Sequence, residues 1–392
     1  MKRIAAIIMH RAFGQSLGEK LVCDAREASI SDLMTTLRKA GLDLIFLVTN
    51  DKQLKERLRA SNVCLIASTS NSSFHFGKTL QGLVSKYLLD GIVYFGSGSG
   101  ALVTNQKMQT LISFAKQNAS AALFNNFYSC DFAAIAQART LLRTNLPAID
   151  NSLGFALSGL GFSCFSLPHD ISTQFDIDTP TDLSILATTE LGGKTLRALL
   201  EQQRPIHSTV SSLIDHLTNR ASRLYLIGRV NPVTWSHFEQ EIACRTSALA
   251  EGRGMRAYPS SKETFLAGAL RLDKPHTFFS RLASIADAAI IDTRPLLCRE
   301  GGLPSRADRF ASDLYRPELI KDQLWATFTR EAMTANIPII LGGHSLVSGG
   351  LYLLSKACWK NHDLPRRLHP ETINWKRSNH EQQRSRLKNS QA

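Results

Sequence analysis

Residues 174–183 read QFDIDTPTDL, and this stretch places Asp176 and Asp178 two positions apart, directly before an expected helix start. In an extended segment the side chains at i and i+2 point to the same side. Thr179-Pro180 then ends the segment and presets a first helical turn. Carboxylates are the ligands that Mg2+ prefers beside nucleotide phosphates, so the pair predicts a Mg2+ half-site. A structural alternative makes Thr179 an N-cap and Asp182 a first-turn acid, which leaves the other two acids unexplained.

On the N-terminal side of this stretch, short apolar runs alternate with helical periods. The runs at 4–9, 44–48, 63–67, 92–95, 121–124 and 162–167 predict buried strands. Segments 30–40, 54–58, 80–88, 102–116 and 132–142 predict helices. Such alternation is typical of a mostly parallel sheet with helices on both faces. We therefore predict an α/β fold over residues 1–203, with a doubly wound, three-layer sheet.

The loop after the first expected strand carries Arg11, Gly14 and Lys20. Free backbone amides and cationic side chains at a strand end suit the oxygens of a triphosphate. A guanidinium can bind phosphate in addition, which gives Arg11 a role. The alternative is an exposed loop with an ordinary surface lysine.

A second glycine-bearing loop, GSGSG at residues 96–100, follows the strand expected at 92–95. Ligands of α/β folds bind at the carboxyl ends of strands, so Gly96, Ser97 and Gly98 are expected to lie along a nucleotide. Glycines permit close approach of a ligand to the bare backbone. The alternative is a plain flexible turn.

The run DIDTPTDL resembles the closing motif of nucleotidyltransferases of the molybdopterin-guanine and 2-phospholactate guanylyltransferase type. Residues 150–168 also resemble the helix and strand that lead into that motif, so the resemblance covers the N-terminal half. It implies that an Asp of this run helps to hold a catalytic metal ion. Of the family's first-loop signature only Gly14, Gly18 and Lys20 can be matched. Where the family has Gly-Asp-x-Pro, with a second metal ligand, this chain has Ser97.

The resemblance implies Mg2+-dependent transfer of a nucleotidyl group from an NTP to a phosphorylated or acidic small molecule. In that reaction Lys20 and Asp178 are the expected catalytic residues, and Asp176 and Asp178 hold the metal. Because Ser97 cannot supply a carboxylate, the alternative is a catalytically degenerate protein of the same fold that binds a nucleotide or sugar-nucleotide.

Residues 223–359 predict a second, smaller α/β domain of no recognised type, after a linker at 204–222. Strands are expected at 224–228, 288–291 and 337–341, and helices at 232–251 and 351–359. Polar residues follow the strands, namely Arg229, Asp292, Arg294, Gly342, Gly343 and His344. Parallel strands would gather them into an anion-binding cleft with glycine amides at its floor. Alternatively, Asp292 forms a structural ion pair with an arginine, and the glycines only allow close helix packing.

The bulk composition limits the function classes. A chain of 392 residues with 43% hydrophobic and 20% charged residues is typical of a globular protein of two or three domains. No apolar run reaches the roughly 18 residues of a membrane helix, and seven widely spaced cysteines favour a reducing compartment, so we expect a cytoplasmic protein.

The net charge of +13 suits an anionic partner. No aromatic platform or nucleic-acid motif accompanies it, which favours an NTP over nucleic acid without excluding the latter. Residues 360–392 are basic and are predicted to be a disordered tail.

Overall fold

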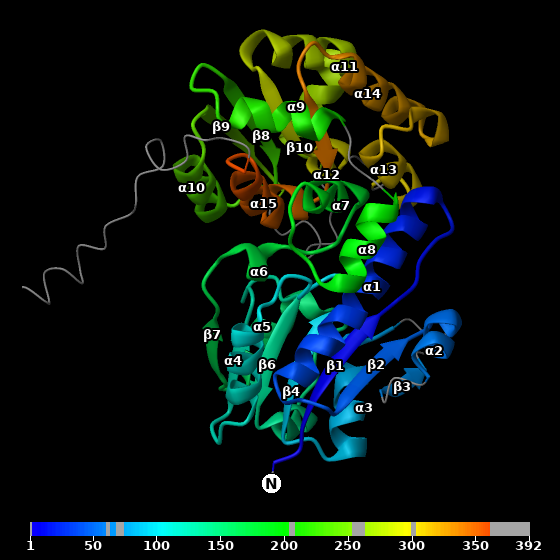
Figure 1. The fold of residues 1–392 in the computed structure, drawn as a ribbon, viewed down its shortest axis with the longest axis vertical. Coiled ribbons are helices and arrows are strands. Elements are labelled where there is room, and N and C mark those ends of the chain that lie inside the picture. The colour runs from blue at the N-terminus through cyan, green and yellow to red at the C-terminus, as the bar shows by residue number, and fades with distance from the viewer. Residues whose placement is uncertain are drawn as a thin grey trace, which may run out of the picture.

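The computed structural model describes residues 2–59, 63–67, 74–203, 208–252, 263–298 and 303–360, and within them it contains two β-sheets (Figure 1). In Figure 1 the first sheet lies at the lower end of the long axis and the second at the upper end. The predicted tail, residues 360–392, lies outside the described residues except for Lys360. No helix of the described segments is both long and apolar enough to cross a bilayer.

The first sheet has seven strands in the order β3-β2-β1-β4-β6-β5-β7. Only β6 runs antiparallel to its neighbours; the other neighbouring pairs are parallel. The strands are β1 (Ile4–His10), β2 (Ile45–Thr49), β3 (Cys64–Ala67), β4 (Gly91–Gly96), β5 (Ala121–Phe124), β6 (Phe132–Ala136) and β7 (Ser163–Ser166).

Helices cover both faces of this sheet, because successive residues of a buried strand point to opposite sides. Ile7 belongs to one core with α3 (Phe76–Tyr87) and α5 (Leu153–Gly159). Its neighbour Ile8 belongs to another core with α1 (Leu17–Lys39) and α4 (Asn105–Ala115). The remaining helices of this half are α2 (Lys52–Leu58) and α6 (Ile171–Gln174). The predicted three-layer α/β architecture is therefore confirmed.

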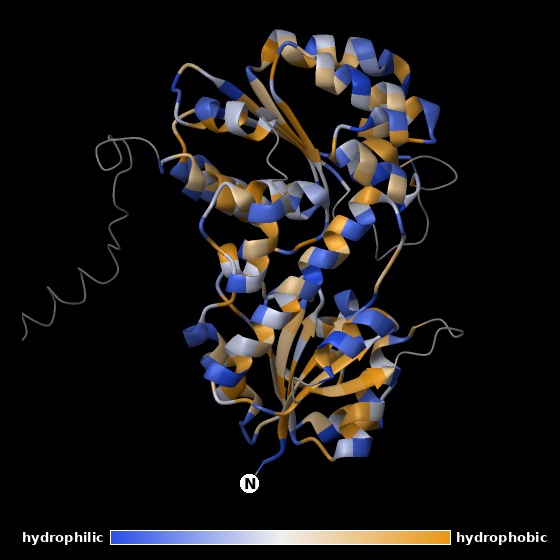
Figure 2. Cartoon of the chain, turned by 45° about the vertical axis from the view of Figure 1, so that its right-hand side comes forward, coloured by the Kyte–Doolittle hydropathy of each residue, from blue (hydrophilic) through white to orange (hydrophobic). Residues whose placement is uncertain are grey.

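The second sheet has four parallel strands in the order β11-β10-β8-β9. They are β8 (Arg223–Gly228), β9 (Arg245–Ala250), β10 (Ala288–Asp292) and β11 (Ile339–Gly342). Around them lie α9 (Ser208–Leu217), α10 (Pro232–Glu241), α11 (Phe265–Ile285), α12 (Thr293–Leu297), α13 (Arg306–Asp313), α14 (Gln323–Thr334) and α15 (Gly349–Ala357). Figure 2 shows the strands of both sheets as mostly hydrophobic, whereas the helices carry mixed faces.

Two segments predicted to be helical contain strands, and those predictions were wrong. Residues 132–136 form β6, which is fully buried between β4 and β5, and only the following 138–143 make a 3-10 helix. The expected helix at 232–251 ends at Glu241, and β9 then pairs with β8. Both strands contain alanines, which have the highest helix propensity, and pairing with other strands overrides that local preference.

Three helices connect the two sheets: α1, α7 (Pro180–Ala187) and α8 (Lys194–Gln203). Helix α1 has 23 residues, about 35 Å of length, so it reaches both cores. Ile30 and Leu33 of its C-terminal half pack on the first sheet, whereas Val22 and Ala25 join a cluster with residues of β8, β10 and β11. Within the stretch expected to link two domains, 204–222, residues 208–217 form α9 and contribute to the same cluster.

Candidate functional site

The stretch that contains Asp176 and Asp178 lies between the carboxyl ends of the two sheets. On one side, the amide of Ile177 donates to the carbonyl oxygen of Gly98, just after β4, at 3.1 Å. On the other side, the hydroxyl of Thr181 donates to the carbonyl oxygen of Leu341, in β11, at 2.6 Å. The acidic stretch therefore contacts both halves of the molecule.

The first contact lies at a point where the strand order reverses, and the second lies on β11, one strand away from such a point. In the first sheet the chain goes from β1 to β2 and β3 on one side and to β4 on the other. In the second sheet it goes from β8 to β9 on one side and to β10 and β11 on the other. Ligands of open α/β sheets bind outside the carboxyl ends of strands at such points. The residues predicted after β1, β4, β8 and β10 occupy these positions.

The loop after β4 closes directly on the acidic stretch. A Cβ added to Gly98 would lie 2.3 Å from Oδ1 of Asp176 and 2.7 Å from the carbonyl oxygen of Ile177. No side chain larger than hydrogen fits there without displacing the carboxyl. The structure thus brings Gly96, Ser97 and Gly98 together with Asp176, as the sequence analysis expected of a shared site.

Gly98→Ala is expected to destabilise the protein by about 1–3 kcal/mol, the usual cost of overpacking, because its methyl group must displace Asp176. Denaturant unfolding of both forms measures this loss. The matched control is Gly82→Ala in α3, where an added Cβ meets nothing within 4 Å and helix propensity predicts a small gain. Equal stability of the Gly98→Ala variant and the wild type would contradict the close packing described above.

Asp176 has one buried carboxylate oxygen, Oδ1, without a hydrogen-bond partner within the described part of the chain. Burial, and then the negative charges of Asp178 and Asp131, hold the pKa of Asp176 well above its usual range. A carboxyl in this state is stabilised by an added positive charge, and a divalent cation is one such charge. The two acids therefore fit a Mg2+ site in their chemistry.

Asp178 is already in contact with a cation of the protein. Arg26, on α1, donates from Nη2 to Oδ1 of Asp178 at 3.0 Å and from Nε to the carbonyl oxygen of Ile177 at 2.6 Å. The Arg26 guanidinium also lies 5.2 Å from the ring centre of Phe13, and Arg306 of α13 lies 4.1 Å from the same ring. Two guanidiniums from the two halves thus flank one aromatic ring beside the acids.

Sequence reasoning missed Arg26 and Phe13. Arg26 lies within a helix rich in charged residues, where a solvent-facing role is the usual one. Nothing in the local pattern distinguishes it, because its partner lies 152 positions further along the chain.

Asp131 is an acid that the sequence analysis did not place in the site. Its backbone carbonyl accepts from the amide of Gly96 at 2.9 Å and from the hydroxyl of Ser99 at 3.0 Å, so it adjoins the loop after β4. Asn125 donates to its carboxylate at 2.9 Å and orients it. Its charge contributes to the raised pKa of Asp176, so a third carboxylate acts on this site although Ser97 supplies none.

Asp182 has the structural role of the alternative interpretation. Its Oδ2 accepts from the amides of Asp178 and Thr179, at 2.9 and 2.6 Å, and from the Thr179 hydroxyl at 3.1 Å. These bonds fix the start of α7. Burial, and then the charge of Asp178, raise the pKa of Asp182 to about 8. The helix-start explanation therefore accounts for Asp182, and Asp176 remains outside it.

The predicted residues of the loop after β1 are spread along its surface. Arg11 and Lys20 are exposed, and Lys20 lies in the first turn of α1. Gly14 has φ +60, and an added Cβ would lie within about 2 Å of the Glu19 carboxylate, so glycine is required for this turn. Glu19 in turn accepts from the hydroxyl of Ser16 at 2.8 Å and caps α1. Of the chain's positive groups, Arg26 rather than Lys20 makes the contact with the acidic stretch.

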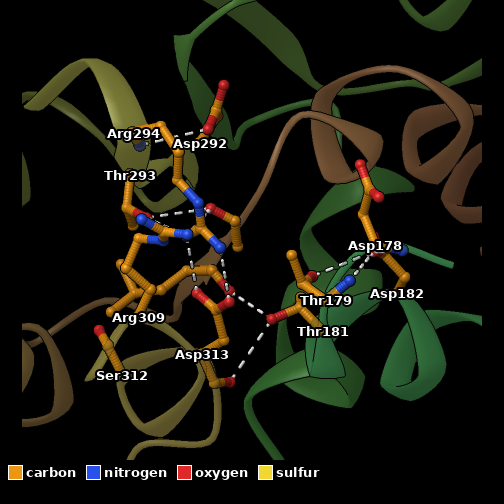
Figure 3. A network of polar contacts seen from close by, with 12 residues as sticks. Asp178, Thr179, Thr181, Asp182, Asp292, Thr293, Arg294, Arg309, Ser312 and Asp313 are labelled. Carbon is orange, nitrogen blue, oxygen red and sulfur yellow. Dashed lines mark hydrogen bonds and ion pairs between the residues drawn. The ribbon is translucent and has the colours of Figure 1, made fainter. Parts of the chain in front are cut away.

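Beyond the second sheet, two arginines are held by buried carboxylates. Arg229 binds Asp292 through Nε at 2.6 Å and Nη2 at 3.0 Å. Arg294 binds Asp313 through Nη1 at 3.2 Å and Nη2 at 3.0 Å, and it also donates to the carbonyl oxygen of Gly342 at 3.0 Å. Figure 3 shows Asp313 between Arg294 and Thr181, whose hydroxyl donates to the carbonyl oxygen of Asp313 at 3.4 Å.

The electrostatics of the two pairs follow from their burial. Burial alone would raise the pKa of Asp292, but the Arg229 guanidinium beside it holds that pKa below its usual range, with smaller contributions from Arg294 and His344. Burial raises the pKa of Asp313, against the opposing effect of Arg294. Structural ion pairs of this kind were the alternative to an anion-binding cleft.

The glycines after β11 pack against the acidic stretch. An added Cβ at Gly343 would lie 2.7 Å from Cγ2 of Thr179, and one at Gly342 would lie 3.2 Å from Cβ of Thr181. His344 follows β11, and the parallel register places the ends of β8, β10 and β11 at the same edge of the sheet. The six residues predicted for the second domain therefore gather at one edge, and that edge adjoins the acidic stretch.

No family model matches this sequence, and no curated protein matches it. Several solved structures resemble about half of this chain at low identity. A cytidylyltransferase from Leptospira borgpetersenii serovar Hardjo-bovis is 13% identical, with 53% of this chain and 98% of that chain covered and a TM-score of 0.39. A nucleotidyl transferase from Methanothermobacter thermautotroptrophicus is 16% identical, with 44% and 90% covered and a TM-score of 0.34. A 4-diphosphocytidyl-2C-methyl-D-erythritol synthase is 16% identical, with 51% and 99% covered and a TM-score of 0.35.

Proposed function

We propose that this protein transfers a nucleotidyl group from an NTP to a phosphorylated or acidic small molecule, with Mg2+ held by Asp176 and Asp178. The observation that carries the proposal is the buried Oδ1 of Asp176. It has no hydrogen-bond partner among the described residues, and it lies at the backbone of the loop after β4. An uncompensated buried acid is costly to a fold, so such a group indicates a site for a ligand or ion.

In this reaction an oxygen of the acceptor attacks the α-phosphorus of the NTP. The bond from that phosphorus to the bridging oxygen breaks, and pyrophosphate leaves with the electron pair. Bound Mg2+ supplies positive charge to the phosphate oxygens. The protein contributes position and charge: Asp176 and Asp178 hold the ion, and the loop of Gly96, Ser97 and Gly98 lies along the nucleotide.

Positive groups on both sides of the acids suit anionic substrates. On the first-sheet side, Arg11 and Lys20 are exposed and available to triphosphate oxygens. Arg26 and Arg306 flank Phe13 beside Asp178. On the second-sheet side, the edge with His344 and the Arg229 pair adjoins the same stretch, and we assign the acidic acceptor to that side.

A second candidate function is nucleotide binding without turnover. It is favoured by the contact of Arg26 with Asp178, since a carboxylate neutralised by a guanidinium is a weaker ligand for a cation. Ser97 also offers a hydroxyl where the resembled family has a carboxylate. In this alternative the ligand is a nucleotide or sugar-nucleotide, and its affinity does not depend on Mg2+.

The test is release of pyrophosphate from each of the four NTPs, with a panel of phosphorylated and carboxylic acceptors. We expect release from one NTP that requires both Mg2+ and an acceptor. Thermal denaturation with the same nucleotides, with Mg2+ or with EDTA, separates the two candidates. No release under any condition, together with nucleotide stabilisation that EDTA leaves unchanged, would establish the binding function and reject the transferase.

A further inference from the structure

A second set of potential metal ligands lies at the end of β1, outside the acidic stretch. His10 closes β1, Glu27 lies on α1, and Asp51 caps the start of α2. One ligand atom from each of the three residues lies within 4.8 Å of the other two. In the parallel register His10 pairs with Thr49, two residues before Asp51, so the fold itself places these groups together.

The surroundings of the His10 side chain are independent evidence for a bound ion at this position. Its side chain is fully buried, and neither ring nitrogen has a hydrogen-bond partner within the part of the chain that the structure describes. The nearest carboxylate oxygen, Oε1 of Glu27, is 3.9 Å from Nε2, which is too far for a hydrogen bond. A buried imidazole without a partner is costly, and metal coordination would satisfy one ring nitrogen.

We propose that His10, Glu27 and Asp51 bind a divalent transition-metal ion of the Zn2+ type. Imidazole nitrogen with two carboxylates suits such an ion, whereas Mg2+ and Ca2+ prefer oxygen alone. Ligand atoms about 3.3–3.5 Å apart surround a tetrahedral Zn2+ with bonds of about 2.0–2.2 Å. The ligand atoms, now within 4.8 Å of one another, would have to close by up to about 1.5 Å to reach that spacing. A fourth position stays open for water.

Neighbouring groups orient the ligand atoms, and two of them, Arg57 and Arg26, carry positive charge that a bound cation must overcome. Arg57 pairs with Oε2 of Glu27, which leaves Oε1 directed toward His10. Oδ1 of Asp51 accepts a hydrogen bond from the amide of Leu54 at 3.0 Å. This bond orients the Asp51 carboxylate, which is one of the proposed ligands. Burial, and then the positive charge of Arg26, lower the pKa of His10 to about 4, so its ring is neutral at pH 7. Neutral imidazole is the form that binds metal.

The bound ion would tie β1, α1 and the turn before α2 together. The loop that carries Arg11 starts at this point, and its Ala12 amide already donates to Oδ1 of Asn50 at 3.0 Å. The ion would therefore hold the base of the loop expected to meet the triphosphate. This role is distinct from that of Mg2+ at Asp176 and Asp178.

The experiment uses the full-length protein after dialysis against EDTA, titrated with Co2+ and followed by visible absorption. We expect one Co2+ per chain, with the bands of a low-coordinate nitrogen and oxygen site and no thiolate charge-transfer band, and displacement by one equivalent of Zn2+. Titration of Asp176→Asn gives the same result, because that variant removes only the proposed Mg2+ ligand. A failure of metal binding here is thus distinguishable from a failure of the transferase proposal.

Two variants test whether the Asp51 and His10 side chains bind the metal ion. Asp51→Asn keeps the helix cap, since Asn is as good an N-cap as Asp, and is expected to weaken Co2+ binding at least about tenfold. His10→Gln is expected to abolish it. The matched control is Asp322→Asn, which changes the cap of α14 and should leave binding unchanged. Unchanged affinity in Asp51→Asn, a thiolate band, or no Co2+ bound by the wild type would overturn the assignment.

Discussion

Replacement of Asp176 by Asn is expected to lower kcat/KM for pyrophosphate release on the order of 100-fold, comparable to the loss of one preorganised electrostatic contact in an enzyme site. The amide has nearly the shape of the acid but carries no charge for Mg2+. Because Oδ1 of Asp176 has no partner among the described residues, the substitution breaks no hydrogen bond of that atom. We therefore expect the variant to lose activity without losing stability. Its thermal denaturation midpoint should equal that of the wild type or exceed it.

The control is Asp24→Asn, an exposed aspartate on α1 close in sequence to Arg26. This variant should retain full activity. Asp178→Ala is expected to reduce activity as well. This variant also removes the hydrogen bond between Arg26 and Asp178, so its stability is expected to change together with its activity. If Asp176→Asn and Asp178→Ala both release pyrophosphate at the wild-type rate, neither residue holds a catalytic metal.

The largest expected loss of stability follows Arg294→Met. Arg294 is 8% exposed and its partner Asp313 is 0% exposed, so the substitution leaves a carboxyl buried without its cation. Removing one member of such a pair costs about 3–5 kcal/mol. The arginine also loses its bond to the carbonyl oxygen of Gly342, at the end of β11. Chemical denaturation monitored by circular dichroism measures the shift.

Two further variants identify the cause. The double variant Arg294→Met with Asp313→Leu removes both charges and is expected to recover most of the lost stability, because apolar residues can replace a buried pair. Arg316→Met disrupts an exposed pair with Glu318 and should leave the denaturation midpoint unchanged. A wild-type midpoint for Arg294→Met would show that the buried pair does not hold the second sheet to the acidic stretch.

The local sequence pattern was sufficient to predict much of the fold. The six strands predicted in the N-terminal half all exist, because short, mostly apolar runs of four to six residues favour strands in a globular protein. The helix start at Thr179-Pro180 also exists, since capping depends on residues within one turn. Residues 132–136 were misassigned because an alanine-rich run satisfies both helical and strand patterns until its neighbours are known.

The sequence by itself determined the α/β class, the order of most strands along the chain, and the presence of two acids that no local role explains. Only the tertiary structure decided their partners: Arg26 lies 152 positions from Asp178, and Thr181 lies 160 from Leu341. The sequence analysis placed one site in each of two domains. The structure brings Gly98 of the first half and Gly342 and Gly343 of the second half to the same acidic stretch, and α1 reaches both cores. Propensity, periodicity and capping act over a few residues, whereas the choice of a buried partner depends on how distant elements pack.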